Sequence, residues 1–379
     1  MRDTASSQLP FIDLQAQRSR ISDQIDAAIR RVLDHGAFIM GPEIIEVERQ
    51  LAERTGAEHC LTCASGTDAL ILPLMAANIG PGDAVLVPSF TFTSSAEVVA
   101  LRGATPVFVD VDPQTFNMDV DSLKAGLIAA EQAGLTAKAI MTVDLFGQPV
   151  DFDPIRDIAD QHGLWILDDA AQAFGATYKG APLGTIGRVT GTSFYPAKPL
   201  ACYGDGGAVF TDDTELYERM KCVRVHGNGG GSAEAKYLGL TARFDSIQAA
   251  VLIEKLKIFD DECDRRNAVA QRYTKGLSDI VQTPRLIEGA TSIWAQYTLV
   301  SEQRDVIVKT LAAENIPTAL FYPRPLHAQA PYQGYPVSGN GLPVTEQLAA
   351  QVVSLPMHPY LEADAQTHII SAVRAALAS

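Results

Sequence analysis

The chain has 379 residues, of which 47% are hydrophobic and 20% charged, the balance of an ordinary globular protein. Its net charge of −15 and its isoelectric point near 4.9 argue against a general binder of nucleic acid or of anionic membranes. The sequence contains no run of eighteen apolar residues, and residues 1–10 lack the apolar core of a signal peptide. These features favour a cytoplasmic protein without a membrane partner.

The first fifty residues predict two helices, over 21–33 and 43–53, separated by a turn at Gly41-Pro42. Short apolar runs then alternate with helical stretches as far as about residue 215. The runs expected to form strands span residues 84–88, 105–109, 139–143, 165–167 and 207–210. Most of them lack polar alternation, so they suit strands buried on both faces of a largely parallel sheet.

One helix between these strands has recognisable boundaries. Asp153 is expected to be its N-cap and Pro154 its first residue, and Gly163 ends it just before a strand. In sheets built from such strand–helix–strand units, ligands bind at the carboxyl ends of the strands. Phe92 and Asp169 fall just past such ends, so a site is expected there.

A long charged helix, over roughly 247–275, is expected to lead from a large domain into a smaller C-terminal α+β part. We place residues 1–255 in the large domain and residues 256–379 in the small one. The chain is long enough for both.

Five cysteines are scattered through the chain, which does not indicate a disulfide framework. Cys60 and Cys63 form a C-x-x-C motif, but no second pair and no paired histidines complete a zinc site. On a strand, positions three apart point to opposite faces. We therefore expect ordinary buried thiols and no metal.

Lys198 stands in an aromatic- and proline-containing run, residues 193–200, just before the glycine-rich turn at 204–207. The expected strand at 165–167 ends in Asp168 and Asp169, which should point in opposite directions. Pyridoxal 5′-phosphate (PLP) enzymes use a lysine to hold the cofactor aldehyde and a carboxylate to keep the pyridine nitrogen protonated. Lysines usually lie on the surface, but the surroundings of Lys198 do not resemble a solvated helix.

Ser65-Gly66-Thr67 forms a turn of small residues that opens an apolar helix. Backbone N–H groups at such a helix start bind phosphate, aided by the helix dipole. Considered alone, the motif fits an ordinary N-cap turn better than a phosphate site. Its significance comes from Lys198 and Asp169 further along the chain.

The sequence does not support two other nucleotide-binding motifs. The glycine-rich residues 227–232 lack the third glycine of a dinucleotide fingerprint and follow no early strand, so a mobile loop is the better interpretation. The sequence also has no G-x-x-x-x-G-K-[ST] motif, which argues against a P-loop ATPase.

Together these residues resemble the DegT/DnrJ/EryC1/StrS family of sugar-nucleotide aminotransferases, which belongs to the fold-type I PLP enzymes. The resemblance implies an α/β fold with a largely parallel, seven-stranded sheet flanked by helices and a smaller C-terminal α+β domain. It also implies PLP as cofactor and a homodimer with active sites at the interface. The matching runs are residues 11–14, 41–43, 65–70, 169–172, 193–198, 204–207 and 357–361.

The resemblance assigns roles to individual residues. Lys198 would form the Schiff base with the cofactor, and Asp169, which begins the D-A-A-Q run, would face the pyridine nitrogen in preference to Asp168. The other implied cofactor contacts are Gly66, Thr67 and Ser193 at the phosphate, Phe92 on the ring, Gln172 near the phenolic oxygen, and Thr241. The family often has Asn where Thr241 stands, which leaves that phosphate contact open.

Residues 198–207 and 243–245 resemble the branch that aminates C3 of a UDP-linked 3-keto-N-acetylhexosaminuronic acid, with L-glutamate as donor. There Arg243 would reach into the other subunit's site and contact the substrate carboxylate, and Phe321 and Tyr322 would lie at the substrate. That branch has His where this chain has Phe321, and phenylalanine cannot hydrogen-bond a carboxylate. The alternative is a neutral keto-6-deoxy sugar on dTDP or GDP, aminated at C3 or C4.

The implied reaction passes the amino group in two halves, so ping-pong kinetics are expected. Three other classes remain as alternatives. A PLP-dependent sugar dehydratase would have histidine at Lys198. The complete set of catalytic-type residues argues against a regulatory or binding member of the family, and the acidic net charge argues against DNA binding. An NAD-dependent dehydrogenase would need the missing fingerprint.

Overall fold

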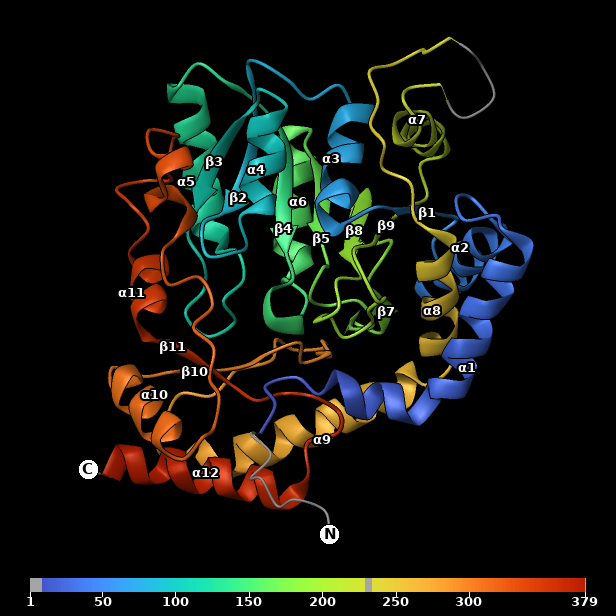
Figure 1. Ribbon diagram of the computed structural model, residues 1–379. Helices are drawn as coiled ribbons and strands as arrows, with labels where there is room; N and C mark the ends of the chain where they lie inside the picture. Colours follow the sequence, from blue (N-terminus) through green and yellow to red (C-terminus); the bar gives the residue numbers. More distant parts are fainter. Residues whose placement is uncertain (1–8, 229–233, 379) are drawn as a thin grey trace.

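The computed structural model describes residues 9–228 and 234–378. At its centre lies a seven-stranded sheet with the strand order β1-β9-β8-β5-β4-β2-β3 (Figure 1). β9 runs antiparallel to both its neighbours, β1 and β8, and the other four pairs of neighbouring strands are parallel, so the prediction of a largely parallel seven-stranded sheet is confirmed. The strands are β1 (His59–Cys63), β2 (Asp83–Pro88), β3 (Thr105–Val109), β4 (Thr136–Val143), β5 (Trp165–Asp169), β8 (Val189–Ser193) and β9 (Gly207–Thr211).

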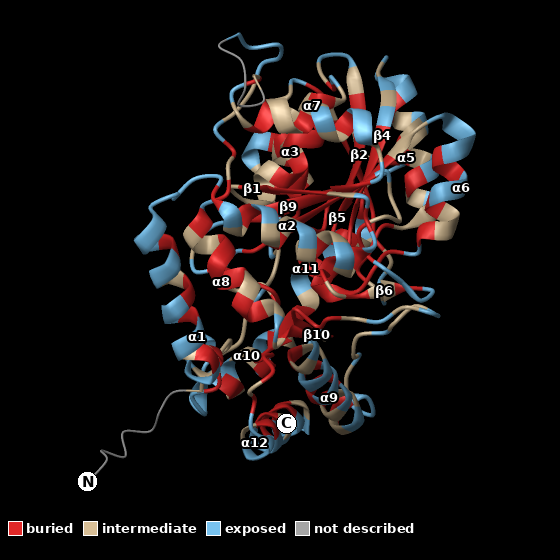
Figure 2. Cartoon of the chain, turned by 90° about the vertical axis from the view of Figure 1, so that its right-hand side faces the viewer, coloured by how far each residue is buried: buried red, intermediate tan, exposed pale blue. Residues whose placement is uncertain are grey.

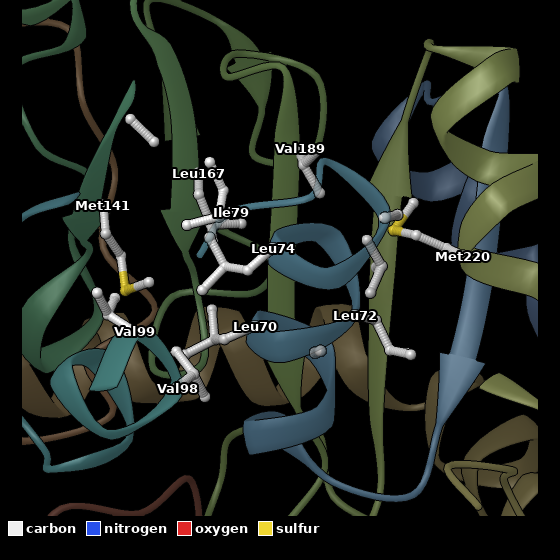
Figure 3. Close-up of a cluster of buried hydrophobic side chains, with 14 of the residues drawn as sticks. Leu70, Leu72, Leu74, Ile79, Val98, Val99, Met141, Leu167, Val189 and Met220 are labelled. Atoms are coloured by element: carbon white, nitrogen blue, oxygen red, sulfur yellow. The ribbon is translucent and has the colours of Figure 1, made fainter. Parts of the chain in front are cut away.

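Helices cover both faces of this sheet. One face carries α3 (Gly66–Ala76), α4 (Ser94–Leu101) and α7 (Thr214–Arg224), whose apolar side chains meet those of the strands (Figure 3). The other face carries α5 (Val120–Gln132) and α6 (Phe152–His162), and towards β1 and β9 it carries α2 (Pro42–Thr55) and α8 (Ser246–Leu256). The strands are therefore buried on both sides, as Figure 2 shows.

The remaining helices and strands lie mainly in the C-terminal third. β10 and β11 form an antiparallel pair, and a further apolar cluster is built from residues 269–376. Leu9 from the N-terminal end packs against that cluster. These elements are α1 (Leu14–His35), β6 (Thr177–Tyr178), β7 (Ala181–Pro182), α9 (Phe259–Leu277), β10 (Tyr297–Val300), α10 (Arg304–Ala313), α11 (Pro343–Gln351), β11 (Val352–Leu355), α12 (Ala363–Ala378) and three short 3-10 helices, η1 (Leu145–Gly147), η2 (Leu326–Ala328) and η3 (Ala330–Tyr332).

Two local predictions were wrong. The single helix expected over 247–275 is two helices, because the chain turns at Lys257 and Ile258 and lets α8 pack against α1 while α9 packs against α12. The helix α6 begins at Phe152, so Asp153 is not its N-cap; the preceding residue, Asp151, accepts a hydrogen bond from the Tyr178 hydroxyl instead. The predicted end of α6 is correct, since Gly163 adopts a left-handed φ of 64°.

Cys60 and Cys63 are free, buried thiols, as expected. They lie on β1 and pack into apolar clusters on different faces of the sheet, and burial raises the pKa of both. Most of the loop predicted at 227–232 lies outside the described residues. Within the described ranges, no helix combines the length and the apolar character needed to cross a membrane.

Candidate active site

Asp168 and Asp169, the last residues of β5, point to opposite faces of the sheet. Ile166 packs on the α6 side and Leu167 on the α3 side, so alternation puts Asp168 on the α6 side and Asp169 on the α3 side. Hydrogen bonds agree with this assignment. Asp169 Oδ2 accepts from Ser95 Oγ on α4 at 3.1 Å, and only 6% of Asp169 is exposed.

Lys198 lies in the connection between β8 and β9, where its backbone N–H donates to the Tyr195 carbonyl at 2.8 Å. Burial lowers the pKa of its amine, and attraction to the Asp169 carboxylate opposes that shift. Burial also raises the pKa of Asp169, opposed by the Ala171 N–H at 3.1 Å, by Lys198 and by Ser95. The structure thus brings the predicted lysine and aspartate together on one face of the sheet.

The predicted phosphate turn lies on the same face. Ser65 caps α3 by accepting from the Asp68 N–H at 3.0 Å, which leaves Gly66 and Thr67 at the start of the helix. A Cβ on Gly66 would lie 2.6 Å from the Cβ of Ser193, so only glycine allows this approach. Thr67 Oγ1 is 2.9 Å from Ser94 Oγ. Hydroxyls and a helix N-terminus converge here, an arrangement suited to an anion.

Gln172 is held by two hydrogen bonds. Its Oε1 accepts from the Phe146 N–H at 2.9 Å, and its Nε2 donates to the Tyr322 hydroxyl at 2.8 Å. Tyr322 adopts a left-handed φ of 57°, an uncommon backbone conformation for a non-glycine residue. Phe321 packs against Phe146 with ring centroids 6.1 Å apart and against Phe11 at 6.4 Å. The predicted substrate residues Phe321 and Tyr322 therefore adjoin Gln172.

Three predicted residues lie at more open positions. Phe92, in the loop before α4, is 57% exposed. Thr241 is exposed, and its hydroxyl lies 2.9 Å from His226 Nε2. Arg243 is half-buried, and its guanidinium makes no hydrogen bond or ion pair with any residue in the described part of the chain. The intervening Ala242 carbonyl accepts from the Ala64 N–H at 3.1 Å, so this segment runs beside the phosphate turn.

Sequence reasoning missed several residues of the site. Ser94 and Ser95 supply hydroxyls to Thr67 and Asp169. Their signal was present, since a run of serines and threonines just past the end of β2 is a typical helix start at a ligand-binding edge. The contribution of Phe146 had no such signal, because it acts through its backbone N–H.

These residues fit PLP. The cofactor carries an aldehyde, a phosphate and a ring nitrogen, which call for an amine, an anion cradle and a carboxylate. Lys198 would supply the amine, the start of α3 with Ser193 the cradle, and Asp169 the carboxylate, and all three lie on one face at the carboxyl ends of the strands. Fold and site together define a fold-type I PLP-dependent aminotransferase.

Comparison with known proteins shows the family to which the chain belongs within this class. The model of the DegT/DnrJ/EryC1/StrS aminotransferase family matches residues 19–374, and the chain belongs to that family. It is 44% identical to a UDP-2-acetamido-2-deoxy-3-oxo-D-glucuronate aminotransferase of Pseudomonas aeruginosa, over 93% of this chain and 96% of the relative. It is 40% identical to a dTDP-3-amino-3,4,6-trideoxy-alpha-D-glucose transaminase of Streptomyces venezuelae, over 97% and 95%.

Solved structures agree. A DegT/DnrJ/EryC1/StrS aminotransferase from Brucella abortus superposes with a TM-score of 0.96 at 49% identity, covering 98% of this chain and 100% of that one. NtdA from Bacillus subtilis, at 26% identity and a TM-score of 0.87 over 100% of this chain and 87% of that one, was solved with bound PMP, the amine form of PLP. The chain is thus a PLP-dependent enzyme of this family.

Proposed function

We propose that this aminotransferase moves the amino group of L-glutamate to C3 of a UDP-linked 3-keto-N-acetylhexosaminuronic acid. The observation that carries the proposal is the apposition of Lys198, Asp169 and the Gly66–Ser193 cradle, on a chain that shares 44% identity with the Pseudomonas aeruginosa enzyme. Such a product would serve the biosynthesis of amino sugars for surface polysaccharide, in the cytoplasm.

Bound PLP supplies an aldehyde that condenses with amines and a ring that takes up an electron pair. Lys198 supplies the amine, and because its lowered pKa favours the neutral form, it can attack a carbonyl and then carry a proton to and from the substrate carbon. Asp169 would keep a proton at the ring nitrogen. Gly66, Thr67 and Ser193 would hold the phosphate, Gln172 would orient the phenolic oxygen and Phe92 would contact the ring.

The substrate assignment rests on Arg243 and on the relative. The guanidinium of Arg243 has no hydrogen-bond or ion-pair partner among the residues that the structure describes, and such a group at the edge of a site suits a carboxylate ligand. The second candidate, a neutral keto-6-deoxy sugar on dTDP, is supported by the apolar ring of Phe321 and by the 40% identity with the Streptomyces venezuelae enzyme. Phe321 and Tyr322 would border either sugar.

We also infer a homodimer with shared active sites. Apolar side chains gather between α1 and α2, where Phe38, Ile39 and Met40 are 47%, 45% and 42% exposed. Exposed apolar patches of this kind mark protein interfaces. Ile39 pairs with Asp245, two residues beyond Arg243, so a second copy covering this patch would lie next to Arg243 and Thr241. Thr241 would then contact the cofactor phosphate.

We keep residues 1–255 and 256–379 as the proposed domains.

The reverse reaction tests the substrate. The enzyme would be incubated with 2-oxoglutarate and a panel of amino-sugar nucleotides, and glutamate would be measured. We expect most glutamate from the UDP-linked 3-amino uronic acid, and we expect Arg243→Ala to raise KM for that sugar more than for a matched neutral sugar. Glutamate from neutral dTDP sugars alone would replace the uronic acid with the second candidate.

A further inference from the structure

Three carboxyl groups gather at the end of β5, although the proposed chemistry uses only Asp169. Asp144 follows β4 and lies on the α6 side with Asp168, and both are 0% exposed. Asp144 directly follows β4, which pairs with β5, and the carboxyl groups of Asp144 and Asp168 each affect the pKa of the other. Asp168 accepts from the Thr142 and Thr190 hydroxyls at 2.8 and 3.4 Å. Asp144 Oδ2 has no hydrogen-bond donor among the described residues.

Two neighbouring carboxylates inside an apolar interior need a proton between them, because unscreened like charges repel strongly there. Among the described residues no cation offsets the pair: Lys198 interacts with Asp169 on the other face, and no cluster of acidic, histidine or cysteine side chains is arranged to hold a metal. Besides each other, the charged group that interacts with both is Asp169.

The donors around the pair place the proton on Asp144. Both oxygens of Asp168 already accept from threonine hydroxyls, which stabilises a carboxylate there. The orphaned oxygen belongs to Asp144, and a protonated carboxyl turns that oxygen into a donor. Burial, reinforced by the charge of Asp168, raises the pKa of Asp144 well above its ordinary range.

We propose that Asp144 is a positioning residue, a neutral carboxylic acid whose hydrogen bond to Asp168 holds Asp169 and Gln172 in place from the far face of the sheet. This rests on the roles proposed above for Asp169 and Gln172. The Asp144 N–H donates to the Asp169 carbonyl at 3.0 Å, and its Oδ1 accepts from the Val150 N–H at 2.8 Å, which closes the turn over 144–150.

That turn carries the second link. Phe146 within it has a left-handed φ of 58°, a costly conformation for a non-glycine residue that must be held by its surroundings. In this conformation its N–H reaches Gln172 Oε1 at 2.9 Å. Loosening Asp144 would therefore release the amide of Gln172 as well as the carbonyl of Asp169.

The proton can be observed without catalysis. In the infrared spectrum of the protein labelled with ¹³C-aspartate at neutral pH, we expect the carbonyl stretch of a neutral carboxylic acid, absent from Asp144→Asn. The exposed Asp364→Asn makes the same chemical change on α12 and should leave the band intact. Absence of the band from the wild type, or its persistence in Asp144→Asn, would overturn the proposal.

The positioning role needs a second readout in the holoenzyme. Asparagine can donate as a neutral acid does, so Asp144→Asn should keep kcat within about threefold, whereas Asp144→Ala should lower it by about tenfold or more. Asp144→Ala should also shift the pH dependence of the bound cofactor's visible absorbance. Equal loss in both variants, or an unchanged pH dependence in Asp144→Ala, would exclude positioning. A different experiment would show that the proposed function is wrong: the Lys198→Ala protein would keep its aminotransferase activity.

Discussion

The two faces of the sheet at the end of β5 hold adjacent aspartates in different surroundings. On the α3 side, Asp169 receives one hydroxyl and one backbone N–H and lies near the amine of Lys198. On the α6 side, Asp168 accepts hydrogen bonds from two hydroxyls, and the carboxyl group of Asp144 affects its pKa. The difference teaches that burial alone does not mark a candidate reactive carboxylate; the proposed reactive face is the one with an amine, the proposed phosphate cradle and some access to solvent.

The largest expected effect lies on the α3 face. Lys198→Ala should lower turnover by at least roughly 10²–10⁴-fold, because the group that carries the proton is lost. The cofactor should still bind without a covalent link. Borohydride treatment followed by peptide mass analysis should find the cofactor fixed at residue 198 in the wild type only. An active Lys198→Ala protein would contradict the proposal that the reactive groups lie on the α3 face.

The next largest effect is expected from replacing each of the two aspartates by asparagine. Asp169→Asn should lower the single-turnover rate by about 10²–10³-fold, since the charge at the ring nitrogen is lost. Asp168→Asn should act mainly on stability, by about 1–3 kcal/mol, because the hydroxyls around it lose their charged acceptor. Single-turnover rates and urea unfolding of both variants make the test. A larger rate loss in Asp168→Asn would reverse the assignment.

A smaller effect is expected at the cradle. Gly66→Ala should cost about 1–3 kcal/mol in stability through the 2.6 Å contact with Ser193, and it should weaken cofactor affinity. Gly134→Ala is the control, since its Cβ would meet nothing within 4 Å, although its φ of 71° makes some strain unavoidable. Cofactor titration of both variants separates a lost cradle from general destabilisation, and equal affinities would argue against a phosphate site at Gly66.

The smallest effect concerns pH and the α6 face. Burial raises the pKa of Asp144 well above its ordinary range, so from about pH 4 upwards the folded chain binds more protons than the unfolded chain. That contribution to stability is present at acidic pH and is lost as the pH rises through this window, at no more than about 1.4 kcal/mol per pH unit for one proton. Asp144→Asn should flatten the slope in urea unfolding of the apoenzyme, and a steeper slope would contradict the shared proton.

The sequence predicted the elements whose signal is local. Lys198, Asp169 and the Gly66 turn were proposed as site residues from motifs, and apolar runs predicted five of the seven strands of the sheet. β8 was missed because Val189–Ser193 contains Thr and Ser, although all five residues are buried. The hydroxyl of Thr190 donates to Asp168 and that of Thr192 donates to the Ala170 carbonyl, so both hydroxyls have hydrogen-bond partners inside the core.

The proximity of Asp144 and Asp168 could not be predicted in this way. Asp144 directly follows β4 and Asp168 lies on the neighbouring β5, so their proximity depends on the register of β4 against β5, where Thr142 lies beside Asp168. The break at Ile258 depends likewise on which neighbours α8 and α9 pack against. Such features follow from tertiary packing, which local propensity does not contain.

The pairing of β1 with β9 has a consequence for folding during synthesis. His59 lies opposite Thr211, so the strand that leads into the phosphate turn cannot find its neighbour until more than half of the chain has been made. Until then β1 and α3 emerge with apolar surface and no partner strand, and contacts so distant in sequence form slowly. We expect nascent chains that stop before β9 to need chaperones, and cofactor capture to begin only after residue 211 has left the ribosome.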